Sequence, residues 1–361
     1  MQQIRFIDND KSKTAFFATL RNRVDQYFKT KNISRNYNLG MVIKTVLLLI
    51  AYILPFCVLL FGNLPQHINL LLWLIMGFSV AGIGMCVMHD ANHGAYSRNG
   101  RVNYWLGLTI NLLGGSVFNW KLQHNILHHT YTNIADMDDD IEDKLFFRFS
   151  PHSQVKWFHR FQFVYAFFFY GVLTLYWAFI KDFVQFRKYI RNGVNKETKE
   201  KNAITLVKII GSKLFYIFIF LFAPIVLLQL PGWSYISGFL LMHFIAGLVL
   251  TVIFQLAHTV ENTSHPLPNT EGTIENNWAI HQLNTTVNFS RKSKFLTWYL
   301  GGLNFQVEHH LFPNICHIHY PEIAPIVKQT AEEFGIPYLE NESFLGAINS
   351  HIRMLKTYGK T

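Results

Sequence analysis

Three histidine clusters have the residue type and the spacing of a metal-binding site. They are His89-Asp-Ala-Asn-His93, His124-Asn-Ile-Leu-His128-His129 and Gln306-Val-Glu-His309-His310. Imidazole is a strong neutral ligand for iron, copper and zinc. Residues four positions apart in a helix share a face, so each of the first two clusters can direct its ring nitrogens toward one point. Because so many imidazoles exceed the needs of one ion, the sequence predicts a site for two metal ions.

Other polar residues near the clusters are predicted to complete this site. His258 ends a hydrophobic run just as His89 follows one, and we expect it to be an eighth ligand. Asp90, Asn125 and Glu308 are expected to orient the ligands by accepting the hydrogen of the second ring nitrogen. The ligand type by itself leaves iron, copper and zinc open as the metal.

The remaining histidines and the main acidic stretch are interpreted as structural or solvent-exposed. His317 and His319 lie near the third cluster, but their alternation is that of a loop or a strand. His243 and His281 are interpreted as structural residues. The acidic stretch 136–143 is predicted to be a solvated loop or a helix cap, because Asp and Glu are rarely buried without a partner. A carboxylate ligand in this stretch is the alternative.

The composition is that of a membrane protein. Half of the residues are hydrophobic and 15% are charged, whereas soluble domains average about 25% charged residues. Several apolar runs reach the roughly 20 residues that cross a bilayer as a helix. Cys57, Cys86 and Cys316 are too far apart for a thiolate metal motif. The net charge of +10 is attributed to basic residues that flank membrane segments rather than to nucleic-acid binding.

Four hydrophobic runs are predicted to cross the membrane as two helical hairpins. A short turn joins the two runs of each hairpin: Gly62–His67 in the first hairpin and Pro231-Gly232 in the second. The predicted spans are 42–61, 68–88, 206–230 and 233–257.

Two further apolar runs are predicted to lie as helices at the membrane interface. The run 101–118 is interrupted by Gly114 and Gly115. The run 161–180 is long enough to cross, but a fifth crossing would move the third histidine cluster to the face opposite the first two. A shared metal site requires all three clusters on one face, so four spans are predicted.

The charge distribution predicts that this face is cytoplasmic. The segment 1–41 is basic and has no early apolar core of the kind that a cleavable signal peptide has. Residues 181–203 carry seven Lys or Arg and three acidic residues, which the positive-inside rule assigns to the cytoplasm. The predicted fold class is therefore all-α, with four spans and a cytoplasmic helical cap that holds a di-metal site. The segments 1–41 and 331–361 are expected to flank a main domain of residues 42–330.

The three clusters resemble the histidine boxes of the membrane-bound fatty acid desaturases, which read H-x₃₋₄-H, H-x₂₋₃-H-H and H/Q-x₂-H-H. Gln306 stands at the first position of the third box, which is similar to the front-end, linoleoyl-CoA desaturase-like subgroup. Enzymes of that subgroup insert a double bond between an existing one and the carboxyl end. The surrounding Asn304–Pro313 and the upstream Gln282–Asn288 also resemble this subgroup. The resemblance covers roughly residues 40–330.

This resemblance implies an oxidoreductase with a di-iron centre that uses O₂ and electrons from a donor to desaturate an acyl chain. Gln306 would then be a possible further ligand, and Trp120, beside the second box, is expected to line the substrate tunnel. The substrate is expected to be a fatty acyl-CoA or an acyl-lipid. No His-Pro-Gly-Gly haem signature occurs in the chain, so we expect a separate small haem cytochrome or a ferredoxin with its reductase. The implied iron ligands are His89, His93, His124, His128, His129, His258, His309 and His310.

Two other functions fit part of the pattern. A hydroxylase on the same scaffold would share the boxes and differ only in its product. A metal transporter would use the histidines as a transit path, but transport predicts ionisable groups near the middle of the spans. Lys44, Lys208 and Lys213 lie toward the ends of their spans instead. A lipid-binding scaffold without catalysis would leave the number of histidines unexplained.

Overall fold

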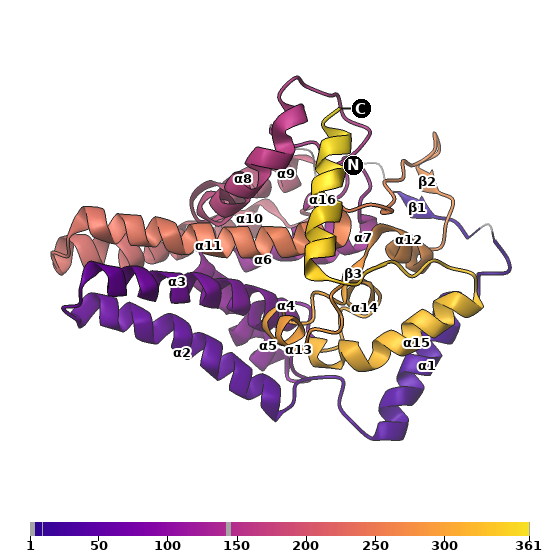
Figure 1. The fold of residues 1–361 in the computed structure, drawn as a ribbon, viewed down its shortest axis with the longest axis horizontal. Helices are drawn as coiled ribbons and strands as arrows, with labels where there is room; N and C mark the ends of the chain where they lie inside the picture. Colours follow the sequence, from indigo (N-terminus) through magenta and orange to yellow (C-terminus); the bar gives the residue numbers. More distant parts are fainter. Residues whose placement is uncertain (1–3, 9, 142–145, 361) are drawn as a thin grey trace.

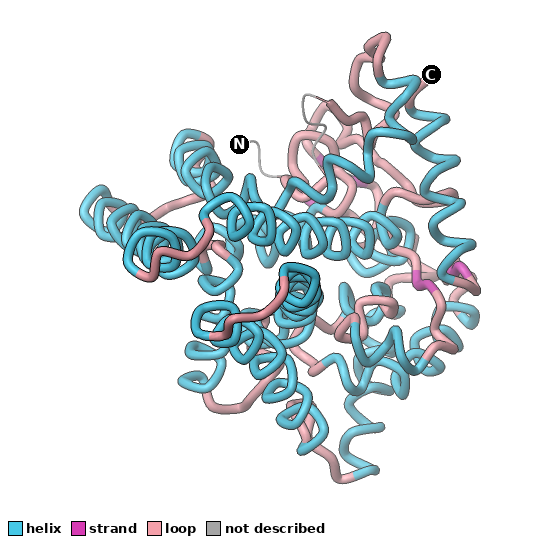
Figure 2. The backbone as a smooth tube through the Cα atoms, turned by 60° about the vertical axis from the view of Figure 1, so that its left-hand side comes forward, coloured by secondary structure: helices cyan, strands magenta, loops and turns pink. Residues whose placement is uncertain are grey.

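The protein is mostly helical, as predicted. The computed structural model describes residues 4–8, 10–141 and 146–360. Strands in the described part are limited to two short parallel pairs, β1 (Arg5–Phe6) with β2 (Thr273–Ile274) and β3 (Asn288–Phe289) with β4 (Glu340–Asn341). Figure 2 shows helices throughout the tube, joined by short loops.

Among the described residues, five helices are long and apolar enough to cross a membrane, which is compatible with a multi-pass membrane protein. Three of the five consist of consecutive α-helical, π-helical or 3₁₀-helical stretches. The five helices are α2 (Leu39–Phe61); α3 (Gln66–Gly82) continued by η1 (Ile83–Met88) and α4 (His89–Asn92); η4 (His159–Phe161), α8 (Gln162–Tyr176), η5 (Trp177–Lys181) and α9 (Asp182–Arg191); α10 (Lys199–Ile217) with η6 (Phe218–Leu227); and α11 (Gly232–His258).

The four predicted spans fall within four of these helices. The run 161–180, predicted as a short interfacial helix, lies within a helix of 33 residues, His159–Arg191, that has the length and composition of a span. Length and composition therefore give five candidates where the sequence analysis predicts four spans, and the number four stays a prediction.

The predicted interfacial helix 101–118 is two shorter elements. α5 (Gly100–Gly107) is followed by the 3₁₀-helix η2 (Leu108–Leu113), which ends at Gly114. Gly114 has a φ of +79°, and a Cβ there would lie 2.7 Å from the Cβ of Ala178. A left-handed residue in such close contact ends the helix, because glycine alone adopts that conformation at little cost.

Helix α11 is the central element, and α3 and α8 pack against it through glycines. In Figure 1, α2, α3 and α11 run side by side. A Cβ on Gly238 of α11 would lie 2.1 Å from the Trp73 ring of α3. A Cβ on Gly247 would lie 2.6 Å from the carbonyl oxygen of Gly171 in α8. Small residues let apolar helices approach closely, which gains dispersion energy where the hydrophobic effect is weak.

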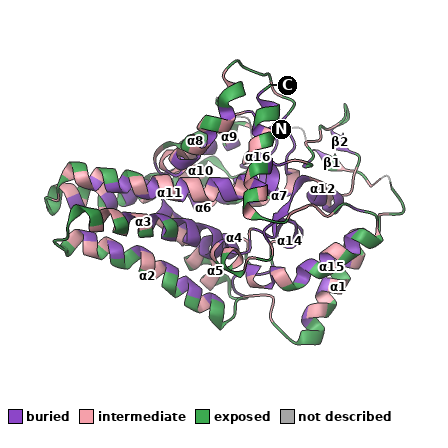
Figure 3. Ribbon diagram, viewed as in Figure 1, coloured by how far each residue is buried: buried purple, intermediate pink, exposed green. Residues whose placement is uncertain are grey.

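The outward faces of these helices are apolar. Along α2, Ile43, Leu47, Ile50 and Leu54 are each at least half exposed, and Figure 3 shows the alternation of exposed and buried residues on this helix. An exposed apolar helix face is expected against lipid acyl chains rather than against water.

The cap is built around the end of α11 from short helices. It contains α6 (Val117–Trp120), η3 (Lys121–His128), α7 (His129–Tyr131), α12 (Trp278–Thr285), α13 (Lys294–Tyr299), α14 (Gln306–Leu311), η7 (His317–His319) and α15 (Tyr320–Glu333).

Both terminal segments pack onto the cap or the long helices. In the segment 1–41, α1 (Phe16–Lys31) buries Leu20 and Val24 in one apolar cluster with Ile323 of α15. In the segment 331–361, α16 (Phe344–Tyr358) buries Leu355, whose carbonyl oxygen accepts a hydrogen bond from the Gln162 side chain. Both segments therefore pack against other parts of the chain, and the division into domains stays a prediction.

Candidate metal centre

The fold brings all three histidine clusters and His258 to one buried place at the end of α11. Their nitrogens form overlapping groups in which the facing atoms lie within 4.8 Å of one another, as ligands around an ion would. The groups are His89, His93, His124 and His309; His128, His258 and His310; and His129, His309 and His310. The third group shares His309 with the first and His310 with the second. Two neighbouring groups of ligands are what a site for two ions requires.

Most of these rings have one nitrogen that is buried and has no hydrogen-bond partner among the described residues. Burying a polar atom without a partner costs about 1–3 kcal/mol, so native proteins rarely leave several together. Cations that coordinate these nitrogens, one in each main group, would satisfy them, and the residues present therefore fit a metal site. The unpartnered atoms are Nδ1 of His89 and His129 and Nε2 of His93, His128, His258, His309 and His310.

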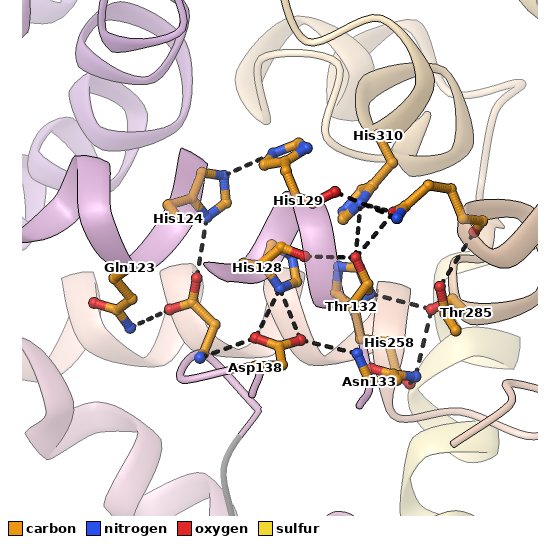
Figure 4. Close-up of polar contacts among 12 residues, drawn as sticks. Gln123, His124, His128, His129, Thr132, Asn133, Asp138, His258, Thr285 and His310 are labelled. Atoms are coloured by element: carbon orange, nitrogen blue, oxygen red, sulfur yellow. Dashed lines mark hydrogen bonds and ion pairs between the residues drawn. The ribbon is translucent and has the colours of Figure 1, made fainter. Parts of the chain in front are cut away.

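In two of the rings, His124 and His128, the second nitrogen donates a hydrogen bond to a carboxylate outside the histidine clusters. His128 Nδ1 donates to both oxygens of Asp138, at 2.9 and 3.0 Å. His124 Nδ1 donates to Asp140 at 3.1 Å. An imidazole whose Nδ1 carries the proton presents a free lone pair at Nε2, which is the atom that a metal requires. Figure 4 shows His128 directed at Asp138, with His124 and His129 beside it.

The third cluster and His258 are oriented in the same way by uncharged acceptors. His310 Nδ1 donates to Gln282 Oε1 at 2.8 Å. His258 Nδ1 donates to the carbonyl oxygen of Thr285 at 3.3 Å. His309 Nδ1 lies 3.2 Å from the Tyr320 hydroxyl. None of these acceptors is predicted as a partner of a ring from the sequence, because they lie far along the chain from the rings that they hold or show no spacing pattern; Gln282 and Thr285 belong to the segment Gln282–Asn288, which is noted above only for its resemblance.

The prediction of a solvated loop over 136–143 is wrong for residues 138–140. Asp138 and Asp139 are 3% and 4% exposed, and Asp138 and Asp140 bind histidine rings. Asp139 accepts hydrogen bonds from Gln185, Lys188 and Tyr189 of α9. Burial is tolerated because each carboxylate has donors around it. The available signal was three consecutive aspartates soon after a histidine cluster; residues 142 and 143 lie outside the described part.

The residues predicted to orient the ligands contact other groups. Asp90 Oδ2 accepts a hydrogen bond from His317 Nδ1 at 2.8 Å, whereas its Oδ1 is 3.8 Å from His89 Nδ1. His317, interpreted from the sequence as a loop residue, is buried, and its Nε2 lies 2.9 Å from the Nζ of Lys44. A buried chain of contacts thus links helix α2 to the first histidine cluster.

The other two such residues, Asn125 and Glu308, also bond to groups other than the histidine rings. Asn125 donates from its side chain to the carbonyl oxygen of Asn92 at 3.0 Å. Glu308 accepts from Asn288 and from the Tyr338 hydroxyl, each at 2.8 Å. Burial raises the pKa of Glu308 to about 7, although these hydrogen bonds oppose the shift. The third cluster itself lies on a buried helix, α14.

Burial favours the neutral, metal-binding form of three of these rings, His124, His129 and His310. It lowers the pKa of His124 to about 3, and burial together with repulsion from neighbouring imidazoles lowers the pKa values of His129 and His310. For His128, burial lowers the pKa, but the Asp138 carboxylate more than offsets this effect and the net shift is upward. A neutral ring is the form that binds a metal.

A largely apolar cavity opens directly onto the histidines. His89, His124 and His309 form one part of its wall, and Gln306 lies beside them. Trp120, the predicted wall residue, lines it and stacks on the His124 ring with 4.6 Å between centroids. Polar groups come from Gln123, Asp140 and Lys181, and the apolar wall from Met85, Met88, Leu173, Trp177, Leu250, Phe254 and Leu303. The arrangement can hold an extended apolar chain against a metal site.

Comparison with known proteins gives one consistent result. A family model described as "Fatty acid desaturase" matches residues 65–341. An "sn-1 linoleoyl-lipid 6-desaturase" of Arthrospira platensis is 38% identical over 341 residues, covering 94% of this chain and 92% of that protein. The protein of the same description from Synechocystis sp. is 35% identical over 352 residues, 96% of each chain. An "Acyl-lipid (8-3)-desaturase" of Physcomitrium patens is 32% identical over 355 residues, 98% of this chain and 73% of that protein.

Proposed function

The chain belongs to the fatty acid desaturase family, and on that premise we propose that it inserts a cis double bond into an acyl chain between an existing double bond and the carboxyl end. The names of its relatives favour an acyl group carried by a lipid. The observation that carries the proposal is the set of buried ring nitrogens without partners, which faces a cavity suited to an acyl chain.

We propose that the site holds two iron ions. The first would be held by His89, His93, His124 and His309 and the second by His128, His258 and His310, with His129 between the two groups. Iron is chosen because the chain is a member of this family, since imidazole by itself does not distinguish among iron, copper and zinc. When bound, the ions would activate O₂, which is the oxidant that removes hydrogen from an unactivated methylene.

The overall reaction is balanced by O₂ and an electron donor. Two adjacent methylenes each lose one hydrogen atom, and the electrons left on the two carbons pair to form the new π bond. The two hydrogen atoms, two electrons from the donor and two protons reduce O₂ to two molecules of water. We propose a separate donor, a small haem cytochrome or a ferredoxin. Exposed basic residues of the 181–203 stretch, Arg187, Arg191 and Lys196 among them, would attract an acidic carrier at the cytoplasmic face.

The residues of the chain position the substrate and the metals. The apolar wall from Leu250, Phe254 and Met88 holds the methylenes and excludes water. Asp138 and Asp140 hold their histidine rings in one tautomer and orientation. The position of the double bond is then set by which carbons the cavity places beside His89, His124 and His309.

The proposal is tested by expression in a host supplied with defined unsaturated fatty acids, followed by gas chromatography–mass spectrometry of the lipids. Wild-type protein should produce one new cis double bond on the carboxyl side of an existing one. His128→Ala and His309→Ala should abolish the product and lower the bound iron, because each removes a ring from the site. His67→Ala is the matched control, since His67 is exposed in the first turn of α3. A hydroxylated product, or activity retained by either site variant, would contradict the proposal.

A further inference from the structure

A buried ion pair joins two of the helices that are long and apolar enough to cross a membrane. Asp182 is the first residue of α9, and Lys213 lies in α10. The Asp182 carboxylate oxygen Oδ2 is 2.5 Å from the Lys213 ammonium nitrogen, and the two side chains are 0% and 5% exposed. Burying two charges is costly, and apolar residues of similar size often give equal or greater stability. Stability alone is therefore a poor explanation for this pair.

The other hydrogen bonds of the pair go to segments that border the substrate cavity. The Lys213 ammonium group also donates to the carbonyl oxygens of Gly114 and of Trp177, the latter at 2.7 Å. Asp182 Oδ1 accepts from the Trp177 indole N–H and from the Asn119 side chain, each at 3.3 Å. Asn119 donates in addition to the Asp182 carbonyl oxygen at 2.7 Å. The ion pair thus ties α6, η5 and α10 together around one buried carboxylate.

Two of these segments each contribute an indole ring to the cavity wall. Trp177 lines the cavity, and its ring packs so closely on the backbone that a Cβ on Gly115 would lie 2.7 Å from it. Trp120 directly follows Asn119 in α6 and lines the same cavity. The Trp120 ring stacks on His124 with 4.6 Å between the ring centroids. The wall that the ion pair holds is therefore the wall beside a candidate metal ligand.

The position of this wall decides which carbons of an acyl chain lie beside the metal ligands. Bonded carbons are about 1.5 Å apart, so a shift of the indole rings by that distance would present a different methylene. A misplacement of about 1 Å caused by a residue remote from the reacting atoms can change a rate about 100-fold. A buried ion pair with satisfied hydrogen bonds resists such a shift, because moving either partner breaks several bonds and leaves a charge unpaired.

We propose that Asp182, with Lys213 as its counterion, is a positioning residue that holds the two indole walls and so fixes the position of the new double bond; this rests on the proposed function. Asp182 holds the Trp177 indole directly. It holds Trp120 through the preceding residue, Asn119. The described lining of the cavity includes both indoles but not Asp182. Replacing Asp182 is therefore expected to change where the chain is oxidised rather than whether it is oxidised.

The test compares the positions of the double bonds that variants of the full chain form. Cells that express each variant receive one unsaturated fatty acid, and mass spectrometry of the lipids identifies every positional isomer. Wild-type protein should form one isomer. Asp182→Leu combined with Lys213→Met removes both charges and the acceptor of the indole N–H, and it should lower the preference for that isomer over the one displaced by one carbon by about tenfold. Asp182→Asn combined with Lys213→Met also removes both charges but keeps a side-chain oxygen, so it should restore much of the preference.

Lys208→Met is the matched control, because Lys208 is exposed on the same helix as Lys213, and it should give the wild-type isomer. Iron content of each purified variant reports whether the metal centre is intact. Asn119→Leu leaves the ion pair in place and removes the link to Trp120, so it provides an independent reading if a double variant loses iron, and it should also form the displaced isomer. The wild-type isomer alone from the iron-containing variants, or equal isomer ratios in the two double variants, would overturn the inference and leave desaturation standing. Failure of the wild type to form any double bond would instead refute the proposed function.

Discussion

Replacing Asp138 by asparagine should weaken metal binding although the side chain keeps its size. The two carboxylate oxygens receive three donors: the His128 ring, the backbone N–H of Asn133 at 3.0 Å and the backbone N–H of Asp140 at 3.0 Å. An asparagine has one acceptor oxygen and one amino group. In either orientation of the amide, the amino group therefore faces a backbone N–H that needs an acceptor.

The size of the effect follows from these contacts. One buried donor left without its acceptor costs about 1–3 kcal/mol, and a charged acceptor of the His128 ring becomes a neutral one, whose hydrogen bonds are roughly half as strong. Removing an orienting partner of a metal-ligating histidine typically lowers metal affinity by about 10- to 100-fold. That range equals about 1.4–2.7 kcal/mol and agrees with the cost of the lost hydrogen bond.

The assay is iron retention by purified protein against increasing concentrations of a chelator, measured together with double-bond formation in cells. The Asp138→Asn variant should release iron at a chelator concentration about 10- to 100-fold lower than the wild type does. Asp136→Asn is the matched control: Asp136 is exposed in the same loop with a φ of +63°, which asparagine adopts readily. If Asp138→Asn binds iron as tightly as the control, the carboxylate does not orient His128 in the way argued above.

Two further predictions concern packing and the metal. Gly238→Ala should lower the stability of the protein in detergent by about 1–3 kcal/mol, because the added Cβ would overlap the Trp73 ring; Gly211→Ala, with open space around its Cβ position, should not, and equal melting temperatures for the two variants would contradict the packing argument. Removal of iron with a chelator should abolish double-bond formation and lower the melting temperature, because a ligand that binds the folded state stabilises it. Ferrous iron should restore both properties, and a melting temperature unaffected by chelation would argue against a metal at the histidine cluster.

Much of the site could be predicted because its signals are local. The spacing His89–His93 and His124–His128 places each pair on one helical face, whatever the rest of the chain does. His258 was predicted from its place at the end of an apolar run, and the structure brings it together with His128 and His310. Apolar runs likewise predicted four of the five long helices, since length and hydropathy are properties of continuous segments.

The acceptors that orient the rings could not be predicted in this way. Gln282 reaches His310 from α12, and Tyr320 reaches His309 from the start of α15. Asp138 and Asp140 stand in a stretch whose composition favours solvent, yet α9 covers it with Lys188 and Tyr189. Conversely, Glu308, adjacent to two histidines in sequence, points to Asn288 and Tyr338.

The sequence by itself determined the ligand types, their local geometry and the apolar helices that carry them. Only the tertiary structure decided that the three clusters and His258 meet at one place, and which carboxylates become buried beside the rings. The physical reason is that covalent spacing sets which residues share a face of one helix. Burial and hydrogen-bond partners depend instead on how distant segments pack together, and local composition is the same for either outcome.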